Sequence, residues 1–225
     1  DSVFDWIGDF AEHWEFKKLR HIKAPIKNSF VDGPFGSNLK TEHFIENGDV
    51  YVIDSGFITS GKFEFNREFK TISFEHFLTV NRSECNYRDI IIAKIGANFG
   101  MSGILPKLEK PSLVSGNTLK LTVNKDKYDI DFIHKQLLCL KWAGEIDLLV
   151  KGSAQPALSM GPMSELSFAI PNTLEEQKAI INHIEFEYKL LDNKISKTQK
   201  LIELLTEYRI ALISEVVTGK VKVID

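Results

Sequence analysis

The stretch TLEEQKAIINHIEFEYKLLDNKISKTQKLIELLTEYRIALISEVVTG, residues 173–219, decides the fold of the C-terminal part of the chain. Thr173, followed three residues later by Glu176, is a capping box and marks the start of a helix. Gly219 is a natural residue just beyond a helix end, and neither proline nor glycine lies between these points. The stretch therefore predicts one uninterrupted helix of about 45 residues, ~65 Å long.

Apolar residues recur at every third and fourth position of this predicted helix. The positions are Ile181, Ile184, Tyr188, Leu191, Ile195, Thr198, Ile202, Leu205, Arg209, Leu212 and Val216. Nine of these eleven residues are apolar, over about five heptads, which is typical of a coiled-coil seam. We therefore expect the nine apolar positions to form a dimerisation seam. A long amphipathic helix that folds back on its own domain is the alternative.

The second half of the predicted helix carries more apolar surface than a two-stranded seam uses. The residues away from the seam are Leu201, Leu204, Ile210, Ile213 and Val217. A helix that is apolar on more than one face is usually enclosed by several neighbours. This pattern indicates an assembly of several subunits.

Residues 1–170 have a different character, with short strand-like runs between turns rich in glycine and asparagine. Strands are predicted at 49–53, 90–95 and 119–123, the last with alternating apolar and polar residues. One helix is predicted at 131–150, with Asp131 as its N-cap. The expected fold is α+β: a globular mixed domain over residues 1–170, one long C-terminal coiled-coil helix over 171–219, and a tail over 220–225.

Composition and charge exclude some classes of protein. Apolar residues make up 43% and charged residues 26%, which are ordinary globular values. The formal net charge of −3 and the lack of a long basic run do not fit a generic polyanion binder. One stretch is locally basic and has Asp32 as its single acid: Lys17, Lys18, Arg20, Lys23, Lys27 and Lys40. It is either a solvated surface or a basic face that would suffice for DNA if partner subunits supplied further phosphate contacts.

Targeting signals and cysteine pairs are not visible in the sequence. No apolar run approaches the ~20 residues that cross a bilayer, and no signal-peptide pattern opens the chain, so we expect no membrane association. Cys85 and Cys139 have no CxxC spacing, so neither a disulfide framework nor a zinc cluster is indicated. A cytoplasmic location fits these features best.

Motifs for catalysis or cofactor binding are also missing. The glycine-rich segment 95–103 fits neither GxGxxG nor a phosphate-binding GxxxxGK[ST] loop. The six histidines show no HExxH arrangement that would suit a metal. No motif for amino-group methylation, S-adenosylmethionine binding or a PD…ExK nuclease is visible. We therefore expect a binding protein without cofactor, metal site or enzymatic activity.

Six short segments, spread along the chain, have sequences that can be compared with those of known families. They are WIGDFAEHWEFKKL at 6–19, GPFGSNLK at 33–40, IIIAKIG at 90–96, GSAQPAL at 152–158, IPNTLEEQKAI at 170–180 and EVVTGK at 215–220. In this order they resemble the target recognition domain and conserved helix of specificity subunits of Type I restriction-modification systems. The resemblance spans nearly the whole chain.

The resemblance implies a specific architecture and specific partners. Such subunits have two recognition domains, each followed by a long helix, and the two helices pack antiparallel as a spacer. Each domain reads one half of a split site in double-stranded DNA. Methyltransferase (modification) subunits dock on the helices, and motor-nuclease (restriction) subunits join them. This chain has one domain and one helix and so corresponds to half a subunit, either a short form that pairs with itself or half of a longer chain.

Candidate DNA-binding residues follow from chemistry. Base reading requires Arg or Lys for guanine and Asn or Gln for adenine, on segments that face the major groove. The candidates on turn-rich segments are Lys40, Arg67, Lys70, Arg82, Lys94 and Asn98. Lys17, Lys18, Arg20 and Lys23 are candidates for phosphate contacts that position the domain. The motif residues Gly36, Ser37, Asn38, Ser153 and Gln155 fit a scaffold better than a variable base-reading role.

Two other functions remain open from the sequence alone. The first is a coiled-coil protein-binding adaptor without DNA specificity, whose globular domain would bind a peptide or a sugar. The second is a hydrolase with an unrecognised site. A measurement of DNA binding distinguishes both alternatives from a DNA-reading subunit, which alone is expected to enrich a short DNA sequence.

Overall fold

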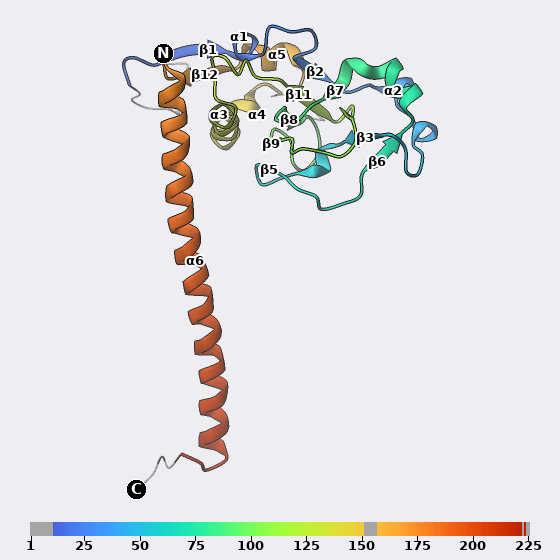
Figure 1. Cartoon of the computed structure of the whole chain (residues 1–225). Coiled ribbons are helices and arrows are strands. Elements are labelled where there is room, and N and C mark those ends of the chain that lie inside the picture. The colour runs from blue at the N-terminus through green and yellow to red at the C-terminus, as the bar shows by residue number, and fades with distance from the viewer. Residues whose placement is uncertain (1–10, 151–156, 222, 224–225) are drawn as a thin grey trace. The chain divides into compact units, whose positions relative to one another are not determined.

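The computed structural model describes residues 11–150, 157–221 and 223. The chain divides into two compact units, of which the first ends at Lys178 and the second begins at Ala179. Strands and short helices make up the first unit, and one long helix, α6 (Leu174–Val217), accounts for most of the second (Figure 1). The expected α+β class with a long C-terminal helix is confirmed. Among the described residues no helix is both long and apolar enough to cross a membrane.

Two four-stranded sheets form the centre of the first unit. One has the order β6-β3-β10-β7: Lys70–Ile72, Val50–Ile53, Ser112–Val114 and Glu84–Cys85. In it β3 and β10 are parallel, and the two outer pairings are antiparallel. The other sheet has the order β2-β11-β8-β9 and is antiparallel throughout: Phe30–Asp32, Thr118–Leu121, Ile90–Ala93 and Ser102–Ile104. The short connection from β10 to β11 joins the two sheets.

Smaller elements surround these sheets. Two two-stranded pairs are antiparallel, β1 (Glu15–Lys18) with β12 (Ser167–Ile170) and β4 (Ile58–Thr59) with β5 (Lys62–Phe63). The short α-helices are α1 (Leu19–Ile22), α2 (Phe74–Val80), α3 (Ile130–Trp142), α4 (Glu145–Leu148) and α5 (Met160–Glu165). The 3₁₀ turns are η1 (Gly36–Asn38), η2 (Thr41–His43), η3 (Ser55–Phe57) and η4 (Asn81–Ser83).

Buried side chains from both sheets form the core of the first unit. One cluster includes Ile53 and Val114 from the first sheet, Ile91 from the second, and Phe57 and Leu105 from the connections. Each such side chain, fully buried, contributes about 1.5–3 kcal/mol. The sheets are also joined by a hydrogen bond, because the Thr118 hydroxyl donates to the carbonyl of Ile53 at 3.2 Å.

The three strands predicted from the sequence are confirmed as β3, β8 and β11, each somewhat shorter than the predicted range. The alternation at 119–123 does not correspond to a water-facing side of β11, however. Thr118 and Lys120 are 0% and 5% exposed, although both are polar. Polar partners inside the first unit explain this: Thr118 bonds Ile53, and Lys120 forms an ion pair with Asp89.

The single helix predicted at 131–150 is wrong in two respects. Gly144 adopts φ +84°, a left-handed conformation that ends α3 and separates it from α4. The N-cap is Asp129, whose carboxylate accepts the backbone N–H of Phe132 at 3.0 Å. Asp131 instead binds the guanidinium of Arg88 at 2.6 Å.

The ends of α6 agree with the sequence. The Thr173 hydroxyl accepts the backbone N–H of Glu176 at 3.2 Å, which is the expected N-cap. At the other end Gly219 has φ +72°, and Lys220 N–H donates to the carbonyl of Glu215 at 2.9 Å, as in a Schellman motif. The second half of the predicted capping box is not formed: the Glu176 side chain accepts from His13 and Trp14, each at 3.0 Å, instead of from the backbone N–H of Thr173. These hydrogen bonds lower the pKa of Glu176.

A buried histidine makes the stability of the fold depend on pH. His134 of α3 is 6% exposed, and its Nε2 lies 3.0 Å from the carbonyl of Ser102. Burial lowers the pKa of His134 below the ordinary value of 6.5. As the pH falls, His134 is therefore protonated in the unfolded chain before it is protonated in the folded chain. The free energy of unfolding is highest above pH 6.5 and decreases as the pH falls below that value.

We expect this pH dependence to weaken in His134→Gln, which keeps hydrogen-bond donors but does not titrate. Urea unfolding of both proteins between pH 7.5 and about 5 measures it, since one pKa unit corresponds to about 1.4 kcal/mol. Equal slopes for the two proteins would show that His134 does not contribute.

Candidate nucleic-acid interface

The turn at residues 33–36 is pressed against the β10–β11 connection. A Cβ at Gly33 would lie 2.1 Å from the carbonyl carbon and oxygen of Ser115, so only glycine fits there. At Gly116 a Cβ would lie 2.9 Å from the carbonyl oxygen of Pro34. This close approach places the Phe35 ring, 49% exposed, at the surface beside the connection.

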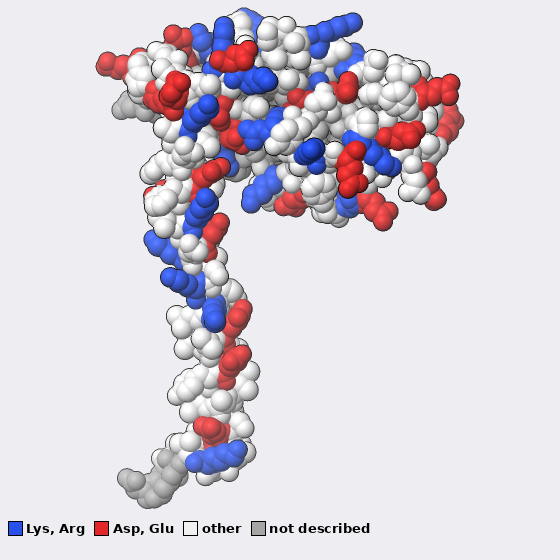
Figure 2. Space-filling model, viewed as in Figure 1, with Lys and Arg blue, Asp and Glu red and all other residues white. Residues whose placement is uncertain are grey.

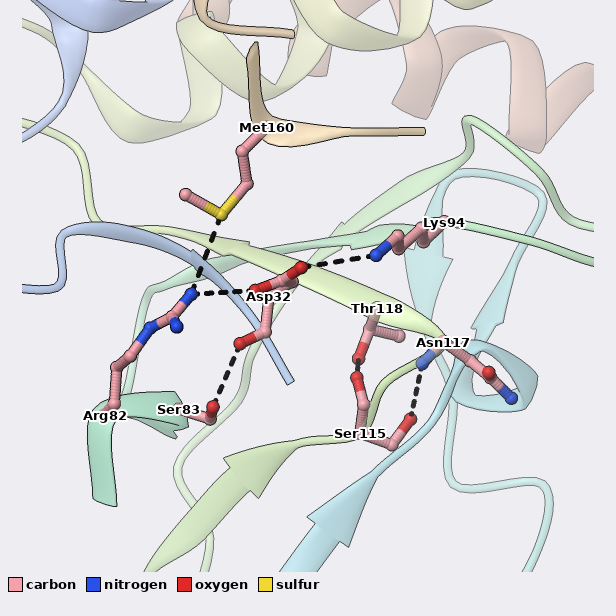
Figure 3. A network of polar contacts seen from close by, with 8 residues as sticks. All are labelled: Asp32, Arg82, Ser83, Lys94, Ser115, Asn117, Thr118 and Met160. Atoms are coloured by element: carbon pink, nitrogen blue, oxygen red, sulfur yellow. Dashed lines mark hydrogen bonds and ion pairs between the residues drawn. The ribbon is translucent and has the colours of Figure 1, made fainter. Parts of the chain in front are cut away.

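Asp32, at the end of β2, joins this turn to two cations (Figure 3). Arg82 Nη2 donates to its Oδ1 at 2.9 Å, and Lys94 Nζ donates to its Oδ2 at 3.3 Å. The Ser83 hydroxyl donates to the Asp32 carbonyl at 2.9 Å. One carboxylate is thus shared between a cation from η4 and a cation from the end of β8.

The two cations differ in what they can reach. The Lys94 side chain is 11% exposed, and its ammonium lies 3.9 Å from the centre of the Phe35 ring, a cation–π geometry. Lys94 therefore holds Asp32 and Phe35 in place. The Arg82 side chain is 59% exposed and remains accessible to a partner molecule.

A small cleft lies next to this turn. Its volume is about 260 Å³, and its lining includes Phe35, Phe44, Asp54, Lys70 and Asn117; we call it the loop cleft. Lys70 Nζ lies 5.1 Å from the centre of the Phe44 ring. Arg67 lies 3.5 Å from the Asp54 carboxylate, with 51% of its side chain exposed. Of the predicted DNA-binding residues, Lys94 therefore contacts Phe35 and Lys70 lines the loop cleft. Arg82 is linked to the turn through Asp32, and Arg67 is linked to the cleft through Asp54.

The other predicted DNA-binding residues lie elsewhere. Lys17 pairs with Glu15, and both Lys18 and Arg20 pair with Glu165 of α5. Lys40 lies 3.5 Å from Glu42. Asn98 is half-buried in the glycine-rich connection after β8. Figure 2 shows this intermixing of charge, with acidic and basic side chains alternating over the visible face.

Asn117 was not among the candidates drawn from the sequence. It is exposed, lines the loop cleft, and its carbonyl accepts the backbone N–H of Lys94 at 2.8 Å. An asparagine amide can read adenine. The sequence alone could not identify Asn117, because its proximity to Phe35 and Lys70 depends on the packing of the two sheets.

Several predicted features lie outside the described residues or carry no chemistry. Ser153 and Gln155 fall outside the described part of the chain, whereas Gly36, Ser37 and Asn38 form η1. No group of three or more histidine, cysteine or acidic residues within the described ranges could hold a metal. Cys85 is buried, and burial raises the pKa of its thiol to about 12, which makes it a poor nucleophile.

The second unit exposes its apolar seam. Six of the predicted seam residues are 41–65% exposed: Tyr188, Leu191, Ile195, Ile202, Leu205 and Leu212. Ile184 and Val216 are half-buried, and Ile181 is 6% exposed. The five apolar residues away from the seam are 52–79% exposed. Exposed apolar surface of this extent is typical of an interaction site.

Comparison with known proteins identifies relatives. Residues 33–206 match the family described as Type I restriction modification DNA specificity domain. A sequence search of curated proteins finds no match.

Solved structures share the fold. One of them comes from work on the structural basis of complex assembly and conformational transition of the type I R-M system. Its TM-score is 0.65 at 10% sequence identity, and the match covers 92% of this chain and 46% of the other chain. The S subunit of a Type-I restriction-modification system from M. genitalium has a TM-score of 0.53 at 19% identity, covering 89% and 45%. The HsdS subunit from Thermoanaerobacter tengcongensis has a TM-score of 0.56 at 13% identity, covering 81% and 39%. The chain thus spans less than half the length of these proteins.

Proposed function

Because this chain belongs to the family of Type I restriction modification DNA specificity domains, we propose that it reads one half of a split DNA site for a modification and restriction complex. The observation that carries the proposal is the family match over residues 33–206, which includes the Phe35 turn, every strand of the two central sheets except β2, and much of α6. The chain itself performs no covalent chemistry in this proposal and acts in the cytoplasm.

Each part of the chain has a role in the proposal. Residues 1–170 form the recognition domain, and 171–219 form a spacer that pairs antiparallel with a second such helix. The exposed seam supports the pairing of the two helices. The exposed apolar residues beside the seam support docking of methyltransferase subunits, and restriction subunits then join the complex. On the recognition domain, exposed Arg67, Lys70, Arg82 and Asn117 are the proposed DNA contacts, and Lys94 positions them.

We expect the double variant Arg67→Gln/Lys70→Gln to bind duplex DNA about 10–100-fold more weakly near 0.1 M salt, because each lost phosphate contact removes about one released counterion. The slope of log affinity against log salt should become shallower by about two. Fluorescence anisotropy with the methyltransferase subunit present, over a salt series, measures both quantities.

The matched control is Lys107→Gln, since Lys107 is an exposed lysine that does not line the loop cleft. If the double variant and this control bind DNA as tightly as the native chain, the loop cleft is not the DNA-binding surface. A changed base preference at an unchanged salt slope would assign Arg67 or Lys70 to bases rather than phosphates, and it would retain the surface.

If α6 sets the distance between two half-sites, deleting one heptad, residues 188–194, should shorten the unread spacer. The deletion keeps the seam in phase and shortens the helix by ~10 Å, or about three base pairs. Half-site bases should be unchanged, since each domain keeps its own loops. Deleting only residues 188–189 turns the rest of the seam by about 200° around the helix and should abolish paired binding. An unchanged spacer at full affinity after the heptad deletion would contradict the role of α6 as a ruler.

A further inference from the structure

Two histidine rings lie face to face on the first unit, close to the loop cleft. His43 stands at the end of η2 and His76 lies in α2. Their ring centres are 3.9 Å apart and the ring planes are tilted by 31°. Both side chains are half-buried. The contact joins two elements that are distant along the chain, so it arises from the fold.

Each of these rings also holds one backbone group of the loop at residues 36–43. Nε2 of His76 lies 2.9 Å from the carbonyl oxygen of Asn38 and donates to it. Nδ1 of His43 accepts the backbone N–H of Lys40 at 3.0 Å. Among the described residues, the bond from His76 is the one hydrogen bond that ties this loop to another element. We call His43, His76 and these two hydrogen bonds the histidine clamp.

The clamped loop forms part of the wall of the loop cleft. Gly36, Leu39 and Phe44 line the cleft, and the backbone groups held by the clamp, at Asn38 and Lys40, lie between them in the sequence. Leu39 and Phe44 pack against a core cluster of the first unit, whereas the rest of the loop is largely exposed. The position of this wall therefore depends on the clamp as well as on the packing.

The hydrogen bonds define the protonation state of the clamp. Nδ1 of His43 accepts an N–H, so this nitrogen carries no proton and the ring is neutral. The ring of His76 can take a proton on Nδ1 and still donate to Asn38. A proton on Nδ1 of His43, in contrast, would face the N–H of Lys40. With both rings charged, the clamp would also bring two positive charges together, and histidine is the side chain that changes charge between pH 5 and 8.

Three carboxylates surround the clamp but do not neutralise it closely. Glu42 Oε1 lies 3.9 Å from Nε2 of His43 and is shared with Lys40 Nζ at 3.5 Å, and its side chain is 67% exposed, so its attraction is screened by solvent. Glu75 is exposed on α2, and the Asp49 carboxylate accepts a backbone N–H at the start of α2. Within the described part of the chain none of the three hydrogen-bonds to either ring, so a second positive charge has no close counter-ion.

We propose that His43 and His76 form a proton-sensitive clamp that positions the loop at 36–43 for DNA, and that protonation of both rings releases this loop. The role is one of positioning, because neither ring has to touch the DNA. The link to DNA binding rests on the proposed function, whereas the opening of the clamp by protons does not.

Matched variants separate titration from packing. His43→Asn/His76→Gln keeps the clamp without titrating, because the Asn oxygen can accept from Lys40 where Nδ1 did and the Gln amide can donate to Asn38 where Nε2 did. His76→Leu removes the donor and opens the clamp at every pH. His21→Gln is the control, since it replaces an exposed histidine of α1.

Two measurements on the full chain, each between pH 8 and pH 5, test the proposal. The first is the NMR hydrogen-exchange rate of the Lys40 amide without DNA, relative to an unstructured peptide at the same pH. The second is fluorescence anisotropy with a duplex and the methyltransferase subunit. At pH 8 the native chain and the double variant should be equal. At pH 5 the native chain and His21→Gln should have about tenfold lower Lys40 protection and duplex affinity than the double variant. His76→Leu should be weak at both pH values, which keeps the test available if the double variant fails to fold.

Equal Lys40 protection at pH 8 and pH 5 in the native chain would overturn the clamp. A loss of protection without any loss of duplex affinity relative to the double variant would overturn its role in positioning the loop for DNA. If the native chain does not bind the duplex at pH 8, the result counts against the proposed function, and the Lys40 protection still decides whether the clamp opens.

Discussion

A chain in which Leu191 and Ile202 are both replaced by aspartate is expected to sediment as a monomer, whereas the native chain is expected to be at least dimeric. Both side chains lie in the seam of α6, where they are 50% and 52% exposed in the single chain. Pairing would bury them, and each aspartate would then place an unpaired charge in an apolar interface. We expect a loss of about 3 kcal/mol or more, which is over ~100-fold in Kd.

The control for this variant is Asn193→Asp/Ser196→Asp, which adds the same charge at positions outside the seam. It should remain paired, and circular dichroism should show a folded first unit in both variants. Sedimentation at micromolar concentration provides the measurement. A native chain that is already monomeric under these conditions would contradict self-pairing.

Replacement of Gly33 by alanine is expected to destabilise the first unit by about 3 kcal/mol or more. The added methyl group would lie 2.1 Å from Ser115 backbone atoms, which cannot rotate away as a side chain could. Either the Phe35 turn or the β10–β11 connection must shift. Because Lys94 contacts both Asp32 and Phe35 there, DNA affinity should fall with stability.

Alanine variants at two other glycines serve as controls, and urea unfolding measures the stability of all three variants. At Gly36 a Cβ meets nothing within 4 Å, but φ is +55°, so alanine should cost about 1–2 kcal/mol. At Gly161 of α5 the space is open and φ is ordinary, so alanine should be neutral or slightly stabilising. If Gly33→Ala is no less stable than Gly161→Ala, the turn does not pack against Ser115.

The sequence predicted best those features that depend on local chemistry. The span of α6 follows from the N-cap at Thr173, the glycine at 219 and the apolar repeat between them, and the structure has each of these features. Strands β3 and β8 follow from their apolar runs. The break at Gly144 was missed because helices tolerate a single glycine, and only its positive φ separates α3 from α4.

The arrangement of charges could not be predicted, because it depends on pairs that are distant along the chain. Asp32 was the single acid in a basic stretch, yet it binds cations 50 and 62 residues later in the sequence. Glu165 likewise neutralises Lys18 and Arg20 from α5. A count of basic residues therefore overstated the free positive charge near the N-terminus and did not find Asn117.

The central claim is that this chain selects a DNA sequence, and selection from randomised duplexes tests it most directly. The chain is incubated with a duplex pool, with and without a methyltransferase subunit, and the bound duplexes are sequenced. We expect enrichment of a short half-site, present as two inverted copies around an unread spacer if two chains pair antiparallel. A pool that shows no enriched sequence even with the methyltransferase subunit present would contradict the account.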